Sequence, residues 1–291
     1  MKRAVILAIC AVLVMGSMAP AATVTVGLNG YNNSYISAKL WNSGTNSHVG
    51  KGYYAGMMSL KSVEETAFDN ATRTDGTSRT PLNKTGDVAA FCIDLRDTVG
   101  WSGNTYSTVA LNEAPSAGNS GGFDQSAMGV LKADAMKRLW THAFASVAGP
   151  LTTTNSTAFQ IALHEILYED APTLAAGEYA KSSGVSLNWN VASSDNAAGT
   201  TKGKYYVTNQ SLAVNQANLW LNAISTSMTK AALAALLAPD DQGATPDSLQ
   251  DLVYETRPGG EVIVPEPTTL AGLLGLGLMG GLGLARRRRE S

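Results

Sequence analysis

Cysteine is scarce in this 291-residue sequence, which contains only Cys10 and Cys92. Cys10 lies in an apolar stretch near the N-terminus that we expect to be removed on maturation, so no intramolecular disulfide is possible in the mature chain. A lone thiol in an oxidising compartment is buried, pairs with another chain or is chemically committed. The sequence therefore excludes a disulfide-stapled fold and draws attention to Cys92.

Histidine is almost as scarce, with three in the chain: His48, His142 and His164. Together with one mature cysteine they show no metal-ligand spacing, so we expect neither a metal nor a cofactor. The sequence also lacks a G-x-S-x-G turn, a P-loop and a dinucleotide-binding fingerprint. A hydrolase is therefore a distant third hypothesis, and we expect that the protein is not an enzyme.

The N-terminus has the three parts of a secretory signal peptide. Lys2 and Arg3 are followed by an apolar region, Ala4 to Met15, and by a small-residue site, Ala19-Pro20-Ala21. We therefore expect residues 1–22 to be removed during export across a membrane.

The C-terminal sequence also has three parts, which follow a linker that begins at residue 257. Val264-Pro265-Glu266-Pro267 is followed by a Gly/Leu-rich apolar segment, residues 270–285, and then by the basic tail Arg286, Arg287, Arg288 and Arg289. At about 1.5 Å per residue, a helix of the apolar segment reaches about 24 Å and spans a hydrocarbon core of about 30 Å only marginally. The four arginines would hold their end on the cytoplasmic side.

This order resembles the PEP-CTERM sorting signal of Gram-negative bacteria. Pro265, Glu266 and Pro267 supply the motif, residues 270–285 the membrane segment and Arg286 to Arg289 the tail. The resemblance implies that an exosortase-type membrane protease recognises and cuts this region. The protein would then be anchored transiently in the inner membrane before it reaches the cell surface or the extracellular matrix. An ordinary tail anchor is the alternative interpretation.

Basic charge is scarce once both signals are gone. Removing Lys2, Arg3, Arg286 to Arg289 and Glu290 from the 21 basic and 23 acidic residues leaves 15 against 22, a net charge of about −7. No basic patch remains to release phosphate counterions, so nucleic acid is excluded as a partner.

Residues 23–256 predict one extracellular α+β domain, strand-rich at both ends with a helical section inserted between them. Alternating or continuous short apolar runs indicate the strands, and apolar residues at helical spacing indicate the helices. The expected strands are 23–27, 52–60, 88–95, 104–111, 202–207 and 249–255, and the expected helices are 124–147, 157–168 and 210–225, the last continuing over 228–238.

Two segments of this domain are best interpreted as a pair. They are Phe91-Cys92-Ile93-Asp94 in an expected strand, and the helix that begins Thr157-Ala158-Phe159-Gln160. They resemble the two halves of bacterial surface thioester domains, in which a strand with Cys-Ile-Asp faces a helix that begins with a Gln. The resemblance implies an internal thioester between Cys92 and Gln160, formed when the thiol attacks the Gln carbonyl and ammonia leaves. Such a bond stores an electrophile that reacts with an amine or hydroxyl held nearby.

Both residues also have structural interpretations. Thr157 to Gln160 fits a capping box, in which the Gln side chain only bonds back to the backbone, and Cys92 fits a small core residue of a buried strand. In the thioester interpretation, the first turn of the helix would offer free backbone N–H groups to the Gln160 carbonyl.

His164 departs from the thioester-domain pattern, in which a Trp is common in the helix motif. It follows Gln160 by four residues, so the two side chains share a face. We consider two roles: a base that assists acyl transfer, with reactivity rising near its unperturbed pKa of about 6.5, or a surface substitution that admits water and disables the bond. Asp94 and Glu165 are further polar candidates, and each is also explained as a structural carboxylate.

The sequence thus predicts an exported protein of the cell surface or biofilm matrix, with an exosortase-type protease as its processing partner. Our first hypothesis is adhesion: covalent attachment to an amine or hydroxyl of a surface or exopolysaccharide target through Cys92 and Gln160. The alternative is a structural or carbohydrate-binding surface protein of the same fold without a thioester.

Overall fold

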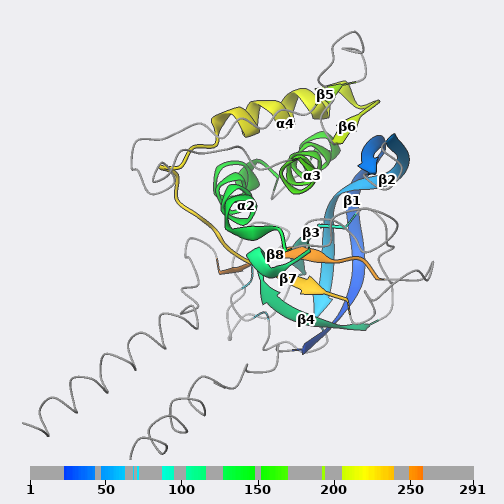
Figure 1. Ribbon diagram of the computed structural model, residues 1–291. Coiled ribbons are helices and arrows are strands. Elements are labelled where there is room, and N and C mark those ends of the chain that lie inside the picture. Colours follow the sequence, from blue (N-terminus) through cyan, green and yellow to red (C-terminus); the bar gives the residue numbers. More distant parts are fainter. Residues whose placement is uncertain are drawn as a thin grey trace, which may run out of the picture. The chain divides into compact units, whose positions relative to one another are not determined.

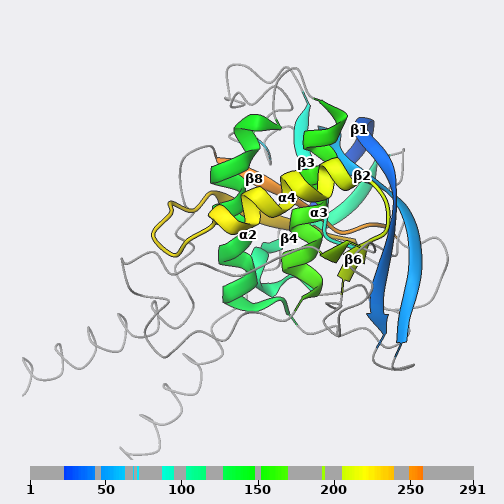
Figure 2. The same cartoon turned by 90° about the horizontal axis from the view of Figure 1, so that it is seen from above.

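Two long strands begin the described part of the chain and lie side by side (Figure 2). Strand β1 (Thr23–Asn42) and strand β2 (Ser47–Ser62) pair antiparallel, with a bulge in β1 between Leu28 and Gly30. Both strands are much longer than the sequence predicts. The computed structural model describes residues 23–42, 47–62, 68, 71, 87–94, 103–115, 127–147, 152–169, 192–193, 205–238 and 249–257.

The sheet closes on itself through six antiparallel strands (Figure 1). Next to β2 lie, in this order, β3 (Val88–Cys92), β8 (Leu252–Arg257), β7 (Ala232–Leu237) and β4 (Asn104–Ala110), and β4 pairs again with β1. Strand β6 (Tyr205–Val207) pairs with a distal part of β1, and β5 (Ala192–Ser193) runs parallel to β6. The ring of six strands gives the fold an enclosed interior.

Strand β3 separates two apolar clusters, because alternate residues of a strand point to opposite faces. Ala90 and Cys92 join the inner cluster, to which all six strands of the ring contribute side chains. Phe91 and Ile93 join the outer cluster, which lies between the ring and the helices. Burial on both faces explains why the sequence of β3 is apolar throughout.

Three helices pack on the outer cluster (Figure 1): α2 (Gly129–Ala143), α3 (Thr153–Tyr168) and α4 (Ser211–Ala223). The 3-10 turns η2 (Leu111–Glu113) and η3 (Phe144–Ser146) accompany them. Helix α3 contacts β1, β2 and β6 as well as both other helices, so its residues are buried from position 156 onward. A helix that is apolar all round needs such a central position.

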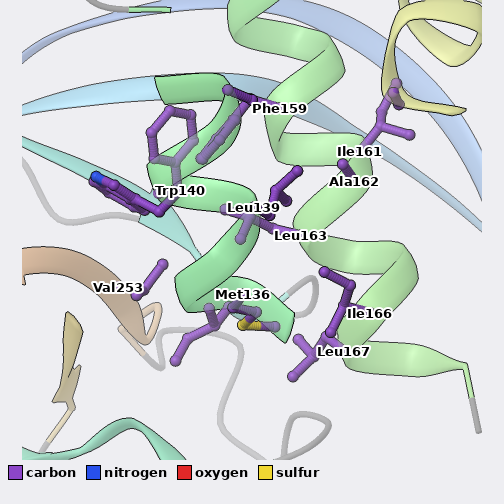
Figure 3. Packing of buried hydrophobic residues seen from close by; sticks show 14 of the residues in the cluster. Met136, Leu139, Trp140, Phe159, Ile161, Ala162, Leu163, Ile166, Leu167 and Val253 are labelled. Carbon is purple, nitrogen blue, oxygen red and sulfur yellow. The ribbon is translucent and has the colours of Figure 1, made fainter. Parts of the chain in front are cut away.

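Aromatic side chains fix the helices on β3. Phe91 lies 4.7 Å from Phe159 of α3 and 5.6 Å from Trp140 of α2 between ring centroids. Trp140 and Phe159 point toward one another from their helices (Figure 3), with centroids 5.5 Å apart. The Trp140 indole also donates to Glu255 Oε2 at 3.1 Å. These contacts hold α3 in a fixed position over β3.

The expected α+β class is confirmed as a strand-rich antiparallel sheet with helices in the middle of the chain. The predicted helical continuation over 228–238 is wrong, because Ala232–Leu237 forms β7. Alanine and leucine favour helices, but burial between β4 and β8 overrides this local preference.

The predicted signal peptide and sorting signal lie outside the described residues, apart from Arg257 at the end of β8. Among the described helices, none has the length and apolar character needed to span a membrane.

Candidate functional site

Cys92 is the last residue of β3, and its side chain points into the enclosed interior. The thiol contacts Met58 Sδ of β2 at 3.8 Å, and the residue is 6% exposed. Strand β2 pairs with β3 over Leu60–Val88, Ser59–Ala89 and Met58–Ala90. The backbone N–H and C=O of Cys92 find their partners elsewhere, on α3.

Gln160 of α3 supplies both of these partners. The Cys92 N–H donates to Gln160 Oε1 at 3.0 Å, and Gln160 Nε2 donates to the Cys92 C=O at 2.7 Å. The oxygen of the Gln amide accepts and its nitrogen donates, so this pairing fixes which end of the amide is which. Two residues 68 positions apart are thereby held against each other in a buried site.

His164 lies one helical turn after Gln160 and is fully buried. Its Nε2 is 2.9 Å from Gln160 Nε2 and 3.2 Å from the Cys92 carbonyl oxygen. The Gln160 amide gives one hydrogen to Cys92 and the other to His164, so the bonding pattern places a lone pair on His164 Nε2 and the proton on Nδ1. The imidazole therefore presents an acceptor to the amide nitrogen.

Two tyrosines complete a chain of hydrogen bonds from this histidine. His164 Nδ1 donates to the Tyr53 hydroxyl at 2.9 Å, and Tyr53 in turn donates to the Tyr205 hydroxyl at 2.7 Å. Tyr53 comes from β2 and Tyr205 from β6, so three elements orient the imidazole. The chain runs from the Gln160 amide to β6.

Burial keeps all of these groups uncharged near neutral pH. It lowers the pKa of His164 to about 3, although the Cys92 backbone carbonyl opposes this shift. Burial, helped by the charge of Asp94, raises the pKa of the Cys92 thiol well above its usual value. Burial and the neighbouring Tyr205 raise the pKa of Tyr53 as well. The site thus holds a protonated thiol, a neutral imidazole and neutral phenols.

The structure overturns the capping-box interpretation of Gln160. Helix α3 begins at Thr153 rather than Thr157, and the Thr152 side chain caps it by accepting from the Asn155 N–H at 3.2 Å. Gln160 lies in the helix interior, where no free backbone N–H groups are available. The expected oxyanion donors of the first turn are therefore wrong as well, and the Cys92 N–H occupies that role at Oε1.

The structure also corrects the expectations for His164. It is not a surface substitution, because the side chain is fully buried between Gln160 and Tyr53. A titration near 6.5 is wrong too, since its pKa lies at about 3. Asp94 and Glu165 are also buried, 1% and 2% exposed, which excludes solvated positions for both.

Sequence reasoning brought Cys92, Gln160 and His164 together but missed Tyr53, Tyr205 and Met58. Strands were expected over 52–60 and 202–207, yet nothing in either pattern connects a tyrosine with the histidine. The contacts arise from the tertiary pairing of β6 with β1 beside α3. No group of three metal-ligating side chains is found in the described residues.

Comparison with known proteins bears on the C-terminal region. Residues 264–289 match the PEP-CTERM protein-sorting motif, which confirms the prediction from Pro265-Glu266-Pro267, the apolar segment and the arginine tail. No curated protein and no solved structure matches the chain. These comparisons do not support the resemblance to thioester domains. The chain therefore carries a PEP-CTERM sorting signal, which implies export in a Gram-negative bacterium and processing by exosortase.

Proposed function

We propose that the mature protein forms an internal thioester between Cys92 and Gln160 and uses it to attach covalently to an amine or hydroxyl on a neighbouring surface or exopolysaccharide. The observation that carries this proposal is the double hydrogen bond between the Gln160 amide and the Cys92 backbone. It holds the carbonyl to be attacked against the residue that bears the thiol.

Bond formation needs no external reactant. Cys92 Sγ attacks Gln160 Cδ, an S–C bond forms, the C–N bond breaks, and the thiol proton leaves with the nitrogen as ammonia. The thiol must first rotate away from Met58 to another side-chain rotamer. The Cys92 N–H, 3.0 Å from Oε1, would stabilise the negative charge that develops on this oxygen.

His164 would carry the proton. Its Nε2 lone pair faces the nitrogen that leaves, at 2.9 Å, so it is placed to accept the thiol proton and to deliver it there. Because its pKa of about 3 disfavours the imidazolium, the proton passes through Nε2 to the leaving nitrogen without being held on the ring. Tyr53 holds the opposite ring nitrogen and so keeps the lone pair aimed at the amide.

Burial supports the storage of a reactive bond. Cys92, Gln160 and His164 are 6%, 1% and 0% exposed, which keeps water from hydrolysing a thioester. When the site opens and an amine or hydroxyl of the target attacks the thioester carbonyl, a new C–N or C–O bond forms, the C–S bond breaks, and Cys92 Sγ takes up the proton that the nucleophile loses. The bond is consumed once, so the protein acts as a single-use adhesin and not as an enzyme.

Intact mass spectrometry of the purified mature protein tests the bond. We expect a mass lower by one ammonia than the sequence requires. Cys92→Ala and Gln160→Ala should each have the full mass of their sequence, and Cys92→Ser serves as a near-isosteric control with a weaker nucleophile. Full mass in the unmodified protein would leave Gln160 as a structural partner of β3 and contradict the proposal.

The sorting step has its own test. Protein collected from the cell surface or medium should end near Pro267 and lack the apolar segment and arginine tail. Replacing Pro265, Glu266 and Pro267 with alanine should leave the chain uncut in the inner membrane. Peptides covering residues 270–286 as the dominant extracellular form would contradict exosortase processing.

A further inference from the structure

Three tyrosines lie exposed on one face of the β1–β2 hairpin: Tyr31 at 49%, Tyr35 at 52% and Tyr54 at 64%. Tyr54 is the register partner of Tyr35, so the two side chains share a face, and Tyr31 follows from the period of two along β1. Their rings contact one another, with centroids 5.5 Å apart for Tyr35–Tyr54 and 6.5 Å for Tyr31–Tyr54. We call these three side chains the tyrosine face.

The opposite face of the same hairpin supplies the core. Ile36 and Ala55, each next in sequence to a tyrosine of the tyrosine face, are fully buried. Tyr53 also points inward, where it bonds His164. Because the core is built from the inner side chains, the exposed rings are not explained by folding.

Glycines beside Tyr54 leave the tyrosine face free of other side chains along β2. On β2 the outward positions before Tyr54 are the exposed glycines Gly50 and Gly52, so this strand presents a single side chain on this face over residues 50–54. A Cβ at Gly52 would collide with the Tyr35 hydroxyl and lie 2.7 Å from its Cζ, which shows that this ring lies across the strand. The result is a shallow aromatic surface with accessible backbone beside it.

From this geometry we propose that the tyrosine face binds a polysaccharide chain. The flat C–H face of a pyranose stacks on aromatic rings, and its hydroxyls bond phenol and amide groups at the ring edges. The Tyr31 and Tyr54 rings are 27° from parallel with centroids 6.5 Å apart, and the Tyr35 ring meets Tyr54 edge-on, at 73° and 5.5 Å. One ring face can therefore stack on a sugar unit while the edge and hydroxyl of its neighbour contact the next unit, so the connected rings suit a polymer better than a single sugar.

The side chains around the tyrosine face favour a neutral polymer over a protein or an acidic glycan. The three rings end in hydroxyls, and the outward positions beside Tyr54 on β2 are the exposed glycines Gly50 and Gly52, so no aliphatic side chain among these residues extends the rings into the large apolar patch that marks a protein interface. The described contacts place the Lys39 ammonium next to Gly50, at the end of the tyrosine face nearer the hairpin turn. Export, which the sorting signal implies, brings the tyrosine face to where extracellular polysaccharides are found.

Affinity gel electrophoresis of the mature protein tests this inference. The probes are neutral polysaccharides (hydroxyethylcellulose, xyloglucan, galactomannan and a soluble β-1,3-glucan) and the acidic polymer alginate. We expect at least one neutral polymer to retard the protein, and Tyr54→Ala to weaken the retardation about tenfold. Tyr54→Phe, which keeps the ring, should bind nearly as the unmodified protein does.

The control is a variant with Leu212→Ala and Leu219→Ala, which removes two exposed apolar side chains of α4 and should migrate as the unmodified protein does. Circular dichroism of each variant confirms that it is folded. Because retardation is reversible and non-covalent, this test is independent of the thioester. No retardation by any neutral polymer would overturn the inference, and so would retardation that survives replacement of all three tyrosines. Tyrosine-dependent dimers without polymer binding would assign the face to a second copy of the chain instead.

Discussion

Two buried polar clusters of this domain are built in opposite ways. Beneath α2, Asp134 and Arg138 are 4% and 3% exposed, and Lys230 Nζ lies 2.5 Å from Asp134 Oδ2. Arg138 also donates to the carbonyl oxygens of Thr226 and Met228 at 2.7 and 2.6 Å. Full charges are here matched by opposite charges and carbonyls, and they tie α2 to the segment before β7.

The cluster of Cys92, Gln160 and His164 contains no charged group at neutral pH. It combines a thiol, an amide carbonyl and an imidazole lone pair, which are groups that react with one another when they are held close. Both clusters are buried, so burial alone does not define their roles. They differ in that the groups of α2 neutralise each other's charge, whereas those around Cys92 are the neutral nucleophile, electrophile and base that the proposed thioester requires.

Breaking the charged cluster should have the largest effect on stability. Arg138→Met leaves buried carbonyls without a donor and Asp134 with one cation, so we expect a loss of about 4 kcal/mol in the free energy of unfolding by urea. The ammonia-deficient mass should persist. Lys137→Met on the same helix serves as the control and should cost about 0.5 kcal/mol or less. Equal losses in the two variants would contradict a structural role for the cluster.

Acid should destabilise the domain through His164. The pKa of this group is about 3 when folded and about 6.5 when unfolded, so the unfolded chain binds the extra proton between these values. The stabilisation that neutral, buried His164 contributes to the folded domain is complete above pH 6.5. Below that pH it declines by about 1.4 kcal/mol per pH unit, or about 3 kcal/mol by pH 4. The free energy of unfolding by urea should depend less steeply on pH over this range in His164→Phe.

His142→Gln, on the exposed side of α2, is the control for this pH series and should keep the steep dependence. An unchanged slope in His164→Phe would mean that His164 is protonated in the folded domain.

The third effect is the loss of the pairing between Gln160 and Cys92. It is measured in the Cys92→Ala background, where no thioester can form. Adding Gln160→Ala leaves the N–H and C=O of residue 92 buried without partners, so we expect a further loss of about 2 kcal/mol by urea unfolding. A loss below about 0.5 kcal/mol would show that the amide does not hold β3.

The smallest effect should come from the orientation of His164. Tyr53→Phe removes the acceptor of His164 Nδ1–H. We expect the free energy of unfolding to fall by about 1 kcal/mol and thioester formation to be roughly fivefold slower. The measurement follows the ammonia-deficient mass after a pulse of synthesis. Tyr54→Phe, the next residue on the opposite face, should form the bond at the unmodified rate. Equal rates in both variants would remove Tyr53 from the site.

Local patterns predicted the parts of this fold that carry continuous apolar sequence. The run around Phe91 and the apolar stripe of residues 159–166 identified β3 and α3, and the expected resemblance to thioester domains, which the comparisons do not support, paired Cys92 with Gln160. The helix start at Thr153 was missed, because the polar residues before Phe159 lack an apolar stripe. Residues 232–237 were assigned to a helix since their strand character comes only from β4 and β8.

The electrostatic state of the site could not be predicted from sequence. His164 was expected to titrate near 6.5 because the neighbours that bury it come from β2 and β6, more than 40 residues away along the chain. The same holds for the hydrogen bonds through Tyr53 and Tyr205, which depend on where β6 joins β1. The sequence therefore predicted which residues meet at the site, and the tertiary structure determined their protonation.

Treatment of the purified native protein with methylamine tests for the Cys92–Gln160 thioester itself. A Cys92–Gln160 thioester predicts the addition of one methylamine per chain, located at Gln160 by peptide mass spectrometry. At the same time, one thiol at Cys92 should become available to a thiol reagent that labels the untreated protein poorly. A chain that gains no methylamine, and whose Cys92 labels equally with and without the amine, would contradict the thioester.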